Sequence, residues 1–342
     1  MPDVHLVITP PAGIGASDLD RVDALRRAFA RGPVEVRRER ADGFWCRRYR
    51  VARQNDWPAG PYRAESPGDA YWLCVDPVHL QISGDQVLLD AMACRDLEPD
   101  QAQALVTTLN AHFDADGFRF AASTPREWVV RCPAMLAAST RAAADVDRRS
   151  IEAFLPGGEP GRQLRRIANE AQMLLHEHPV NQSREARGQA AVNGIWLWGG
   201  GALAGPTGVP APECVWSDAL HVRAMAQAAG TDSHPLPAGR DAIVAALTGL
   251  SRPGLHTERP LVIDLSPTAA QDWCAWLATD WIAPLQAAAR GAGWRVRATC
   301  VLPALDATCT LFRPDVFRAL RRRSLTWYAA AAMPDEPAHG AA

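Results

Sequence analysis

Short apolar runs that suit strands alternate with helix patterns at both ends of the chain, and this alternation constrains the fold most strongly. Near the start, Val4–Thr9 is an apolar run that stops at two prolines, and a helix pattern follows over residues 18–32. Near the other end, residues 260–265 and 294–302 are strand-like, with a long helix pattern between them. Strands that alternate with helices usually lie parallel in one sheet. The two ends together therefore predict an α/β domain with a largely parallel sheet.

The middle of the chain has a different order of elements. From residue 71 the pattern is strands, one helix over residues 97–113 and strands again, followed by a helix over residues 160–177. This order is typical of a compact α+β unit. Residues 41–70 show no clear period, so we expect loops there. The prediction is an α/β domain interrupted by an inserted α+β domain, with the α/β domain at 1–70 and 195–325, the inserted domain at 71–194 and a disordered tail at 326–342.

The charged residues exclude several classes of function. The chain has 36 basic and 38 acidic residues and a net charge of −2, so no nucleic-acid partner is expected. Every basic side chain is arginine, which excludes a Walker phosphate loop and a Schiff-base lysine. No apolar run approaches the roughly 18 residues of a membrane helix, and the start lacks a signal-peptide pattern. We therefore expect a cytoplasmic protein that has no contact with a membrane.

Several familiar site patterns are only partly present. The eight cysteines include no Cys-x-x-Cys pair, as expected for reduced, buried thiols. His176 and His178 are too close in sequence to share a helical face, so we predict no metal site and no cofactor. The glycines at 199–201 do not form the dinucleotide-binding pattern, because prolines follow where its helix should begin. Ser217 and His221 are four residues apart, which suits a helix start better than a nucleophile and its base.

The densest polar cluster lies between residues 176 and 201. Glycines that directly follow a strand allow backbone N–H groups to face an anion, and an arginine can hold a phosphate or carboxylate through two parallel bonds. The alternative is structural: a proline ends one helix, an asparagine caps the next turn and the glycines shape a tight connection. The predicted ligand-binding residues are His178, Asn181, Arg184, Asn193, Gly199 and Gly201.

This order of features resembles the archaeal-type cofactor-independent phosphoglycerate mutases, a family of the alkaline phosphatase superfamily. The similarity spans about residues 70–300 and is strongest where the family returns from its inserted domain to its phosphatase-like domain. The residues that match the family there are His178, Pro179, Asn181, Arg184, Gly188, Asn193, Gly199 and Gly201. The resemblance implies an alkaline-phosphatase-like domain. The sequence is most similar to a bacterial branch that includes the regulatory protein of the pathogenicity-factor cluster, its E-type member.

The chain departs from that family where the chemistry takes place. The family's enzymes use a serine nucleophile and two divalent metals, which neutralise charge on the attacking and leaving oxygens. The first strand here leads to no acidic residue, and residues 260–265 are followed by no histidine. The carboxylates available near the later strands are Asp264, Asp272 and Asp306. The family's arginine-containing phosphate clamp in the inserted domain is also missing. These departures predict that the two-metal phosphomutase reaction has been lost.

Three hypotheses about function follow. The first is a regulatory or metabolite-binding protein that binds a small phosphorylated or carboxylate metabolite, or a protein partner, in place of catalysis. The second is an active cofactor-independent phosphoglycerate mutase or phosphatase whose ligands lie elsewhere in the sequence. The third is a structural interaction protein with an empty pocket. The first is favoured by the missing ligand residues.

Overall fold

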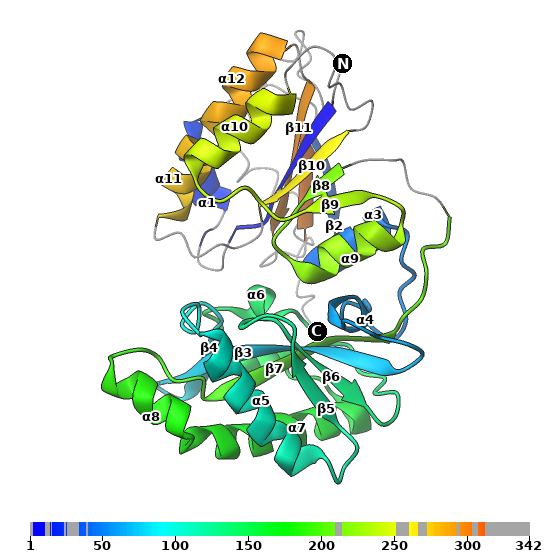
Figure 1. The fold of residues 1–342 in the computed structure, drawn as a ribbon, viewed down its shortest axis with the longest axis vertical. Coiled ribbons are helices and arrows are strands. Elements are labelled where there is room, and N and C mark those ends of the chain that lie inside the picture. The colour runs from blue at the N-terminus through cyan, green and yellow to red at the C-terminus, as the bar shows by residue number, and fades with distance from the viewer. Residues whose placement is uncertain are drawn as a thin grey trace, which may run out of the picture. The chain divides into compact units, whose positions relative to one another are not determined.

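The computed structural model divides the chain into two compact units (Figure 1). Unit 1 comprises residues 1–41, 212–218 and 232–342, and unit 2 comprises residues 42–211 and 219–231. The structure describes residues 3–10, 14, 16–23, 25, 34–38, 40–208, 214–250, 260–265, 272–292, 295–302 and 307–311. The tail expected at 326–342 lies outside the described residues.

Unit 1 is built on a seven-stranded sheet in the order β2-β12-β11-β1-β10-β8-β9. The strand β1 pairs in parallel with both β10 and β11, and Val4 lies opposite Leu261. The pairs β10–β8 and β8–β9 are also parallel, whereas β12 runs antiparallel to β11 and β2. The predicted α/β domain with a largely parallel sheet is therefore confirmed. The strands are β1 (Asp3–Ile8), β2 (Val34–Arg38), β8 (Cys214–Trp216), β9 (Asp232–His234), β10 (Leu261–Leu265), β11 (Arg295–Leu302) and β12 (Ala307–Leu311).

Helices of unit 1 cover one face of this sheet (Figure 1). Their apolar side chains, such as Leu247, Leu277 and Trp281, pack with strand residues such as Leu6 and Ile263 in one buried cluster. The single long helix expected over 269–293 contains a π-helical segment in its middle. The helices are α1 (Ala16–Leu19), α10 (Arg240–Leu250), α11 (Trp273–Trp276), the π-helix η2 (Leu277–Ile282) and α12 (Ala283–Ala292). The helix expected over 18–32 falls partly outside the described residues.

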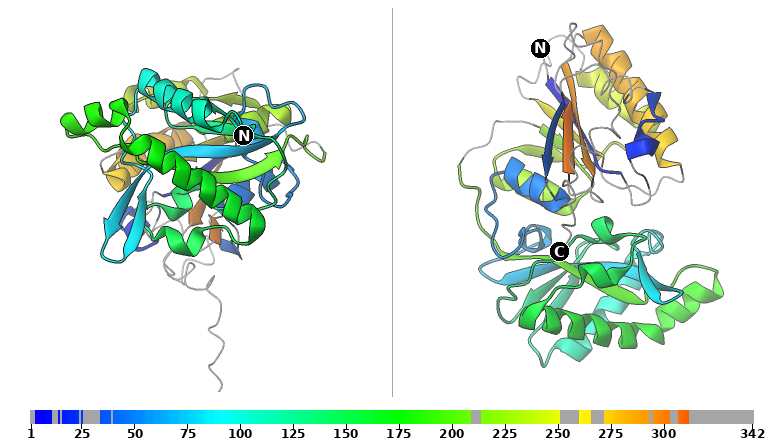
Figure 2. Two further views of the ribbon diagram at one scale, coloured as in Figure 1. Left: turned by 90° about the horizontal axis from the view of Figure 1, so that it is seen from below. Right: turned by 180° about the vertical axis from the view of Figure 1, so that it is seen from behind.

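Unit 2 contains a mainly antiparallel sheet in which β3 is the central strand. It pairs with β4, β6 and β7, and β5 pairs with β6. The two strands expected at the start of this region form one strand of 13 residues. Figure 2 shows β3 and β7 side by side. The strands are β3 (Tyr71–Ser83), β4 (Gln86–Asp90), β5 (Arg119–Ala122), β6 (Trp128–Cys132) and β7 (Gly194–Ala202).

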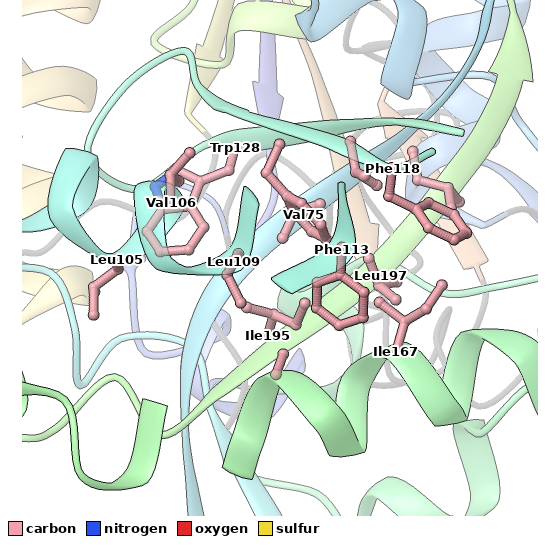
Figure 3. Packing of buried hydrophobic residues seen from close by; sticks show 14 of the residues in the cluster. Val75, Leu105, Val106, Leu109, Phe113, Phe118, Trp128, Ile167, Ile195 and Leu197 are labelled. Atoms are coloured by element: carbon pink, nitrogen blue, oxygen red, sulfur yellow. The ribbon is translucent and has the colours of Figure 1, made fainter. Parts of the chain in front are cut away.

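The helices α5 and α7 pack their apolar faces into the core of unit 2. Leu105, Leu109 and Phe113 of α5 pack with Ile167 of α7 and with side chains of β3 and β7 (Figure 3). These residues follow the helical spacing seen in the sequence, so the predicted inserted α+β unit is present. The helices are α3 (Ala41–Arg48), α4 (Gly60–Arg63), α5 (Pro99–Phe113), α6 (Ala143–Val146), the 3-10 helix η1 (Ile151–Phe154), α7 (Gly158–His176), α8 (Pro179–Ala186) and α9 (Leu220–Ala228). Across the described residues, no helix is both long and apolar enough to cross a membrane.

The division between the units differs from the expected one at residues 70 and 195. Residues 42–70 belong to unit 2 and contain α3 and α4 in place of the expected loops. The strand β7 also belongs to unit 2, because it forms hydrogen bonds with β3 from Tyr71 to Val78. Residues 219–231 return to the same unit, where α9 packs against α4. Contacts between segments far apart in sequence place residues 42–70, β7 and residues 219–231 in unit 2. Local periodicity in the sequence could not show these contacts.

The glycine run at 199–201 continues β7 and does not form the expected turn after it. A Cβ atom at Gly201 would lie 2.4 Å from Cβ of Pro58, and one at Gly200 would lie 2.4 Å from the Tyr71 hydroxyl. Gly199 has a φ of 66° and would bring a Cβ atom to 2.9 Å from Cβ of Ala59. The glycines therefore allow neighbouring backbone to approach β7 closely.

We expect Gly201→Ala to lower the free energy of unfolding by about 1–3 kcal/mol, because the added methyl group must displace Pro58. The matched control is Gly205→Ala, since a Cβ atom there has nothing within 4 Å and its effect should stay within about 0.5 kcal/mol. Urea denaturation of both variants measures the difference. Equal stability of the two variants would contradict the close approach at Gly201.

Candidate functional site

The predicted ligand-binding residues are engaged in hydrogen bonds or close packing within unit 2. His178 is the N-cap of α8: its Nδ1 accepts from the backbone N–H of Val180, and its Nε2 lies 3.0 Å from the Thr108 hydroxyl. Burial lowers the pKa of His178, so the neutral ring that can accept at Nδ1 is favoured. The imidazole therefore fixes the start of α8 and contacts α5.

Arg184 is completely buried and connects α8 with α5. Its Nε donates to the Ala190 carbonyl at 2.8 Å, one terminal nitrogen to Gln101 Oε1 at 3.0 Å and the other to Asp96 Oδ1 at 2.5 Å. Although burial alone would raise the pKa of Asp96, the hydrogen bond and charge of Arg184 lower it. Asp96 is the carboxylate that pairs with the Arg184 guanidinium. The guanidinium thus has a complete set of protein partners.

Asn181 and Asn193 hold the segment before β7 in place through hydrogen bonds. Asn181 donates to the carbonyls of Leu175 and Val192 and accepts from the Val192 N–H. Asn193 accepts from the backbone N–H of Leu80 and donates to the carbonyl of the same residue. Both amides complete backbone hydrogen bonding at strand and helix ends, as buried polar groups require.

Gly199 and Gly201 lie at the carboxyl end of β7, whereas His178, Asn181 and Arg184 lie on or beside α8. The Gly199 N–H donates to the Thr140 hydroxyl at 2.9 Å. The geometry gives each of the six residues a structural role. Ligand binding by them stays a prediction, and Arg184 is the residue at which it is most directly tested.

Unit 2 also contains a buried ionic cluster. None of its residues is among the predicted ligand-binding residues. Arg63 of α4 forms an ion pair with Asp76 of β3 at 2.5 Å and lies 3.3 Å from Glu127. Its guanidinium also lies 5.0 Å from the centre of the Trp198 ring, whose indole N–H donates to Asp76 at 2.7 Å. The Arg63 side chain is only 6% exposed, so its charge must be neutralised within the protein.

This cluster extends to α9 through Glu127 and His221. Glu127 accepts from the backbone N–H at the start of α9, at Leu220, over 3.3 Å. Burial raises the pKa of Glu127, and the neighbouring charge of Arg63 opposes that shift. The His221 ring meets the Trp198 ring edge to face at 5.7 Å. Only weak signals for this site are present in the sequence: Asp76 stands before a proline, and Arg63 lies in the stretch expected to be loops.

His221 is held in its neutral form. Burial, together with the charges of Arg63 and Arg223, lowers its pKa to about 3. Its Nδ1 is buried and has no hydrogen-bond partner within the described part of the chain. A proton on this ring would place a second positive charge beside Arg63, which explains the direction of the shift.

A second group of polar residues lies where strands of unit 1 end. The Ser217 hydroxyl donates to Asp264 Oδ2 at 2.6 Å, and both side chains are almost fully buried. Asp272, the next carboxylate along the chain, accepts from the Ala275 N–H and caps α11. At the end of β1, the Thr9 N–H donates to the Leu265 carbonyl. Ser217 therefore contacts a carboxylate, and His221, four residues further along the chain, belongs to unit 2.

Comparison with known proteins gives local sequence similarity to one class of enzyme. The chain is 28% identical over 108 residues to the 2,3-bisphosphoglycerate-independent phosphoglycerate mutase of Methanosarcina barkeri, which covers 31% of this chain and 27% of that protein. It is 39% identical over 57 residues to a probable enzyme of the same name from Geobacter sulfurreducens, covering 17% of this chain and 14% of the relative. No family model matches. Segments of this chain are homologous to cofactor-independent phosphoglycerate mutases.

Two solved structures align along most of the chain. The cofactor-independent phosphoglycerate mutase of Thermoplasma acidophilum is 12% identical, with 92% of this chain and 90% of that chain aligned and a TM-score of 0.41. The PH0037 protein of Pyrococcus horikoshii is 13% identical, with 93% and 92% aligned and a TM-score of 0.47. Because both scores lie below 0.5, the assignment of the fold class rests on the strand pairing described above.

We expect Arg184→Ala to lower the free energy of unfolding by about 2–3 kcal/mol, since it removes three hydrogen bonds and leaves polar partners unpaired. The exposed Arg187→Ala should change it by less than about 0.5 kcal/mol. The destabilisation should shrink as the pH falls below about 4, the ordinary pKa of aspartate, because the unfolded chain then takes up a proton that Arg184 disfavours at Asp96 in the folded protein. Denaturation at several pH values measures this. If Arg184→Ala also abolishes the binding of a phosphorylated acid, the predicted ligand role gains support; unchanged affinity would contradict it.

A second variant tests the neutral histidine. Below pH 6.5 the unfolded chain binds a proton at His221 that the folded protein excludes down to about pH 3, so wild-type stability must fall with pH across that window. We expect His221→Phe to remove this loss of stability. As the pH falls, the free energy of unfolding of the variant relative to the wild type should therefore rise by up to about 1.4 kcal/mol per pH unit. The exposed His176→Phe serves as control. Parallel pH profiles for wild type and His221→Phe would contradict the neutral state.

Proposed function

We propose that this chain is a phosphoglycerate-mutase-like protein that has lost the two-metal phosphoryl-transfer site and acts as a regulatory protein that binds a small anionic metabolite. The proposal places it with the degenerate bacterial branch that includes the E-type regulatory protein of the pathogenicity-factor cluster. The bond between Ser217 and Asp264 carries this proposal. This bond lies at the strand ends where the resemblance to phosphoglycerate mutases places the metal ligands.

Within the described residues, the side chains at these strand ends do not supply the ligands that a pair of divalent metals needs. Two such ions need several carboxylate or imidazole ligands that can approach them together. Asp264 is only 1% exposed and accepts a hydrogen bond from Ser217, while Asp272 caps a helix. No group of three His, Cys, Asp or Glu residues that could hold a metal ion occurs within the described ranges.

Binding in place of catalysis is consistent with what the chain retains. The matched relatives are phosphoglycerate mutases by name, and the aligned segments cover about a quarter or less of their length. Arginine is the only basic side chain available to hold an anion, and a guanidinium binds phosphate or carboxylate strongly. We infer that the small phosphorylated or carboxylate metabolite is retained as a ligand.

The deciding experiment is a coupled assay for the interconversion of 3- and 2-phosphoglycerate with added Mn²⁺ or Mg²⁺, run beside an active archaeal mutase. We expect no turnover above the level of buffer. Chelator should leave the melting temperature unchanged, because a bound structural ion contributes folding free energy that its removal would reveal. Asp264→Asn then separates the alternatives: turnover that this variant abolishes, or two metals per chain with Asp264 or His234 as ligands, would overturn the proposal.

Binding is tested separately by thermal shift with 3-phosphoglycerate and other phosphorylated acids. A ligand at 100 times its Kd stabilises the folded state by about 2.7 kcal/mol, which gives an easily measured rise in melting temperature. No shift with any of these acids would contradict metabolite binding and favour a structural interaction protein.

A further inference from the structure

A small apolar pocket opens in unit 2 beside α7. It contains about 330 Å³ of empty space, part of which is open to solvent. Three elements supply its apolar walls: the segment that includes η1, the helix α7 and the strand β7. The side chains that matter here are Phe154, Leu155, Leu164, Ala168, Ile195 and Leu197. Only a small part of this space is enclosed, so the site suits a small ligand.

The pocket is continuous with the core of the unit. Ile195 and Leu197 belong to the buried cluster beneath α7, and Figure 3 shows both on the ribbon of β7 next to that helix. On the outer wall, Leu155 is 38% exposed. Phe154 is half-buried and lies under the Arg149 guanidinium, which is 4.3 Å from the ring centre. An apolar ligand would remove part of this hydrocarbon surface from water, which is favourable.

One charged side chain, Arg165, lines this pocket. Two other arginines of α7 are paired with carboxylates: Arg162 with Glu159, and Arg166 with Asp116 and Glu170. Arg165 differs from them.

In the part of the chain that the structure describes, Arg165 forms no ion pair, and its one hydrogen bond goes to the Pro156 carbonyl at the edge of the pocket. This bond fixes one terminal nitrogen of the guanidinium. A half-buried guanidinium without a carboxylate partner, set beside apolar walls, is complementary to a ligand that carries both a negative charge and hydrocarbon.

We propose that this pocket binds a small apolar carboxylic acid, with its hydrocarbon part between α7, β7 and the η1 segment and its carboxylate paired with Arg165. A highly polar acid such as 3-phosphoglycerate suits the site poorly, because it would leave the apolar walls uncovered and its own hydroxyl groups without partners. The proposal does not depend on the function proposed above, since its ligand and its residues are different.

The test is calorimetric titration of the full chain with 3-phenylpropionate and with octanoate, compared with the uncharged 3-phenylpropanol and with 3-phosphoglycerate. We expect the two apolar acids to bind, and the alcohol and 3-phosphoglycerate to bind at least about tenfold more weakly. Arg165→Gln should weaken binding of the acids about tenfold, a loss of about 1.4 kcal/mol, and should leave the alcohol unaffected. Arg165→Lys keeps the charge and should restore most of the affinity.

Matched variants on the same helix control for general effects. Arg162→Gln removes a charge one turn away and should bind the acids as the wild type does. Ala168→Leu fills the pocket and should abolish binding. Gln172→Leu adds the same side chain at an exposed position and should leave binding unchanged. Melting temperatures of all variants establish that they fold. Absence of binding by both acids, equal binding of acid and alcohol, or wild-type affinity in folded Arg165→Gln or Ala168→Leu would each overturn the proposal.

Discussion

Burying the guanidinium of Arg63 requires neutralisation of its charge, and the neutralising groups come from several elements of unit 2. Asp76 lies on the long strand β3, Glu127 just before β6, and Trp198 on β7. Each of these elements must be in place before the charge is fully compensated, because an unpaired buried charge is strongly unfavourable. The ion cluster therefore adds a requirement for charge compensation to an arrangement of strands that backbone hydrogen bonds and apolar packing also hold.

The same cluster accounts for the position of α9 in the fold. This helix is separated from the rest of unit 2 in sequence by β8, which belongs to unit 1. Its first backbone N–H group, at Leu220, has Glu127 as its acceptor, and the carboxylate also compensates the positive end of the helix. His221 then packs on the indole of Trp198. A short segment is thus assigned to one unit by a few polar contacts as well as by its apolar face.

Long elements could be predicted from the sequence, whereas pairings between distant segments could not. The helices α5 and α7 were predicted because their apolar residues recur at helical spacing, and the strands β1, β10 and β11 because they are apolar runs. The short strands β8 and β9 were missed because three residues carry no usable period. Arg184 was selected as a ligand-binding residue, which stays a prediction. Its partner Asp96 lies 88 residues away, and no local pattern reveals such a contact. Arg63 was missed for the same reason.

The order of strands in unit 1 has a consequence for how the protein is made. The strand β1 is synthesised first, yet both of its neighbours in the sheet, β10 and β11, come from the last third of the sequence. At synthesis rates of about 5–20 residues per second, the first strand waits roughly 13 to 50 seconds for a partner. During that time β1 is an apolar segment whose backbone edges are unpaired, so it can associate with other nascent chains. Production of this protein in cells should therefore depend on chaperones that shield β1 until β10 and β11 have been made.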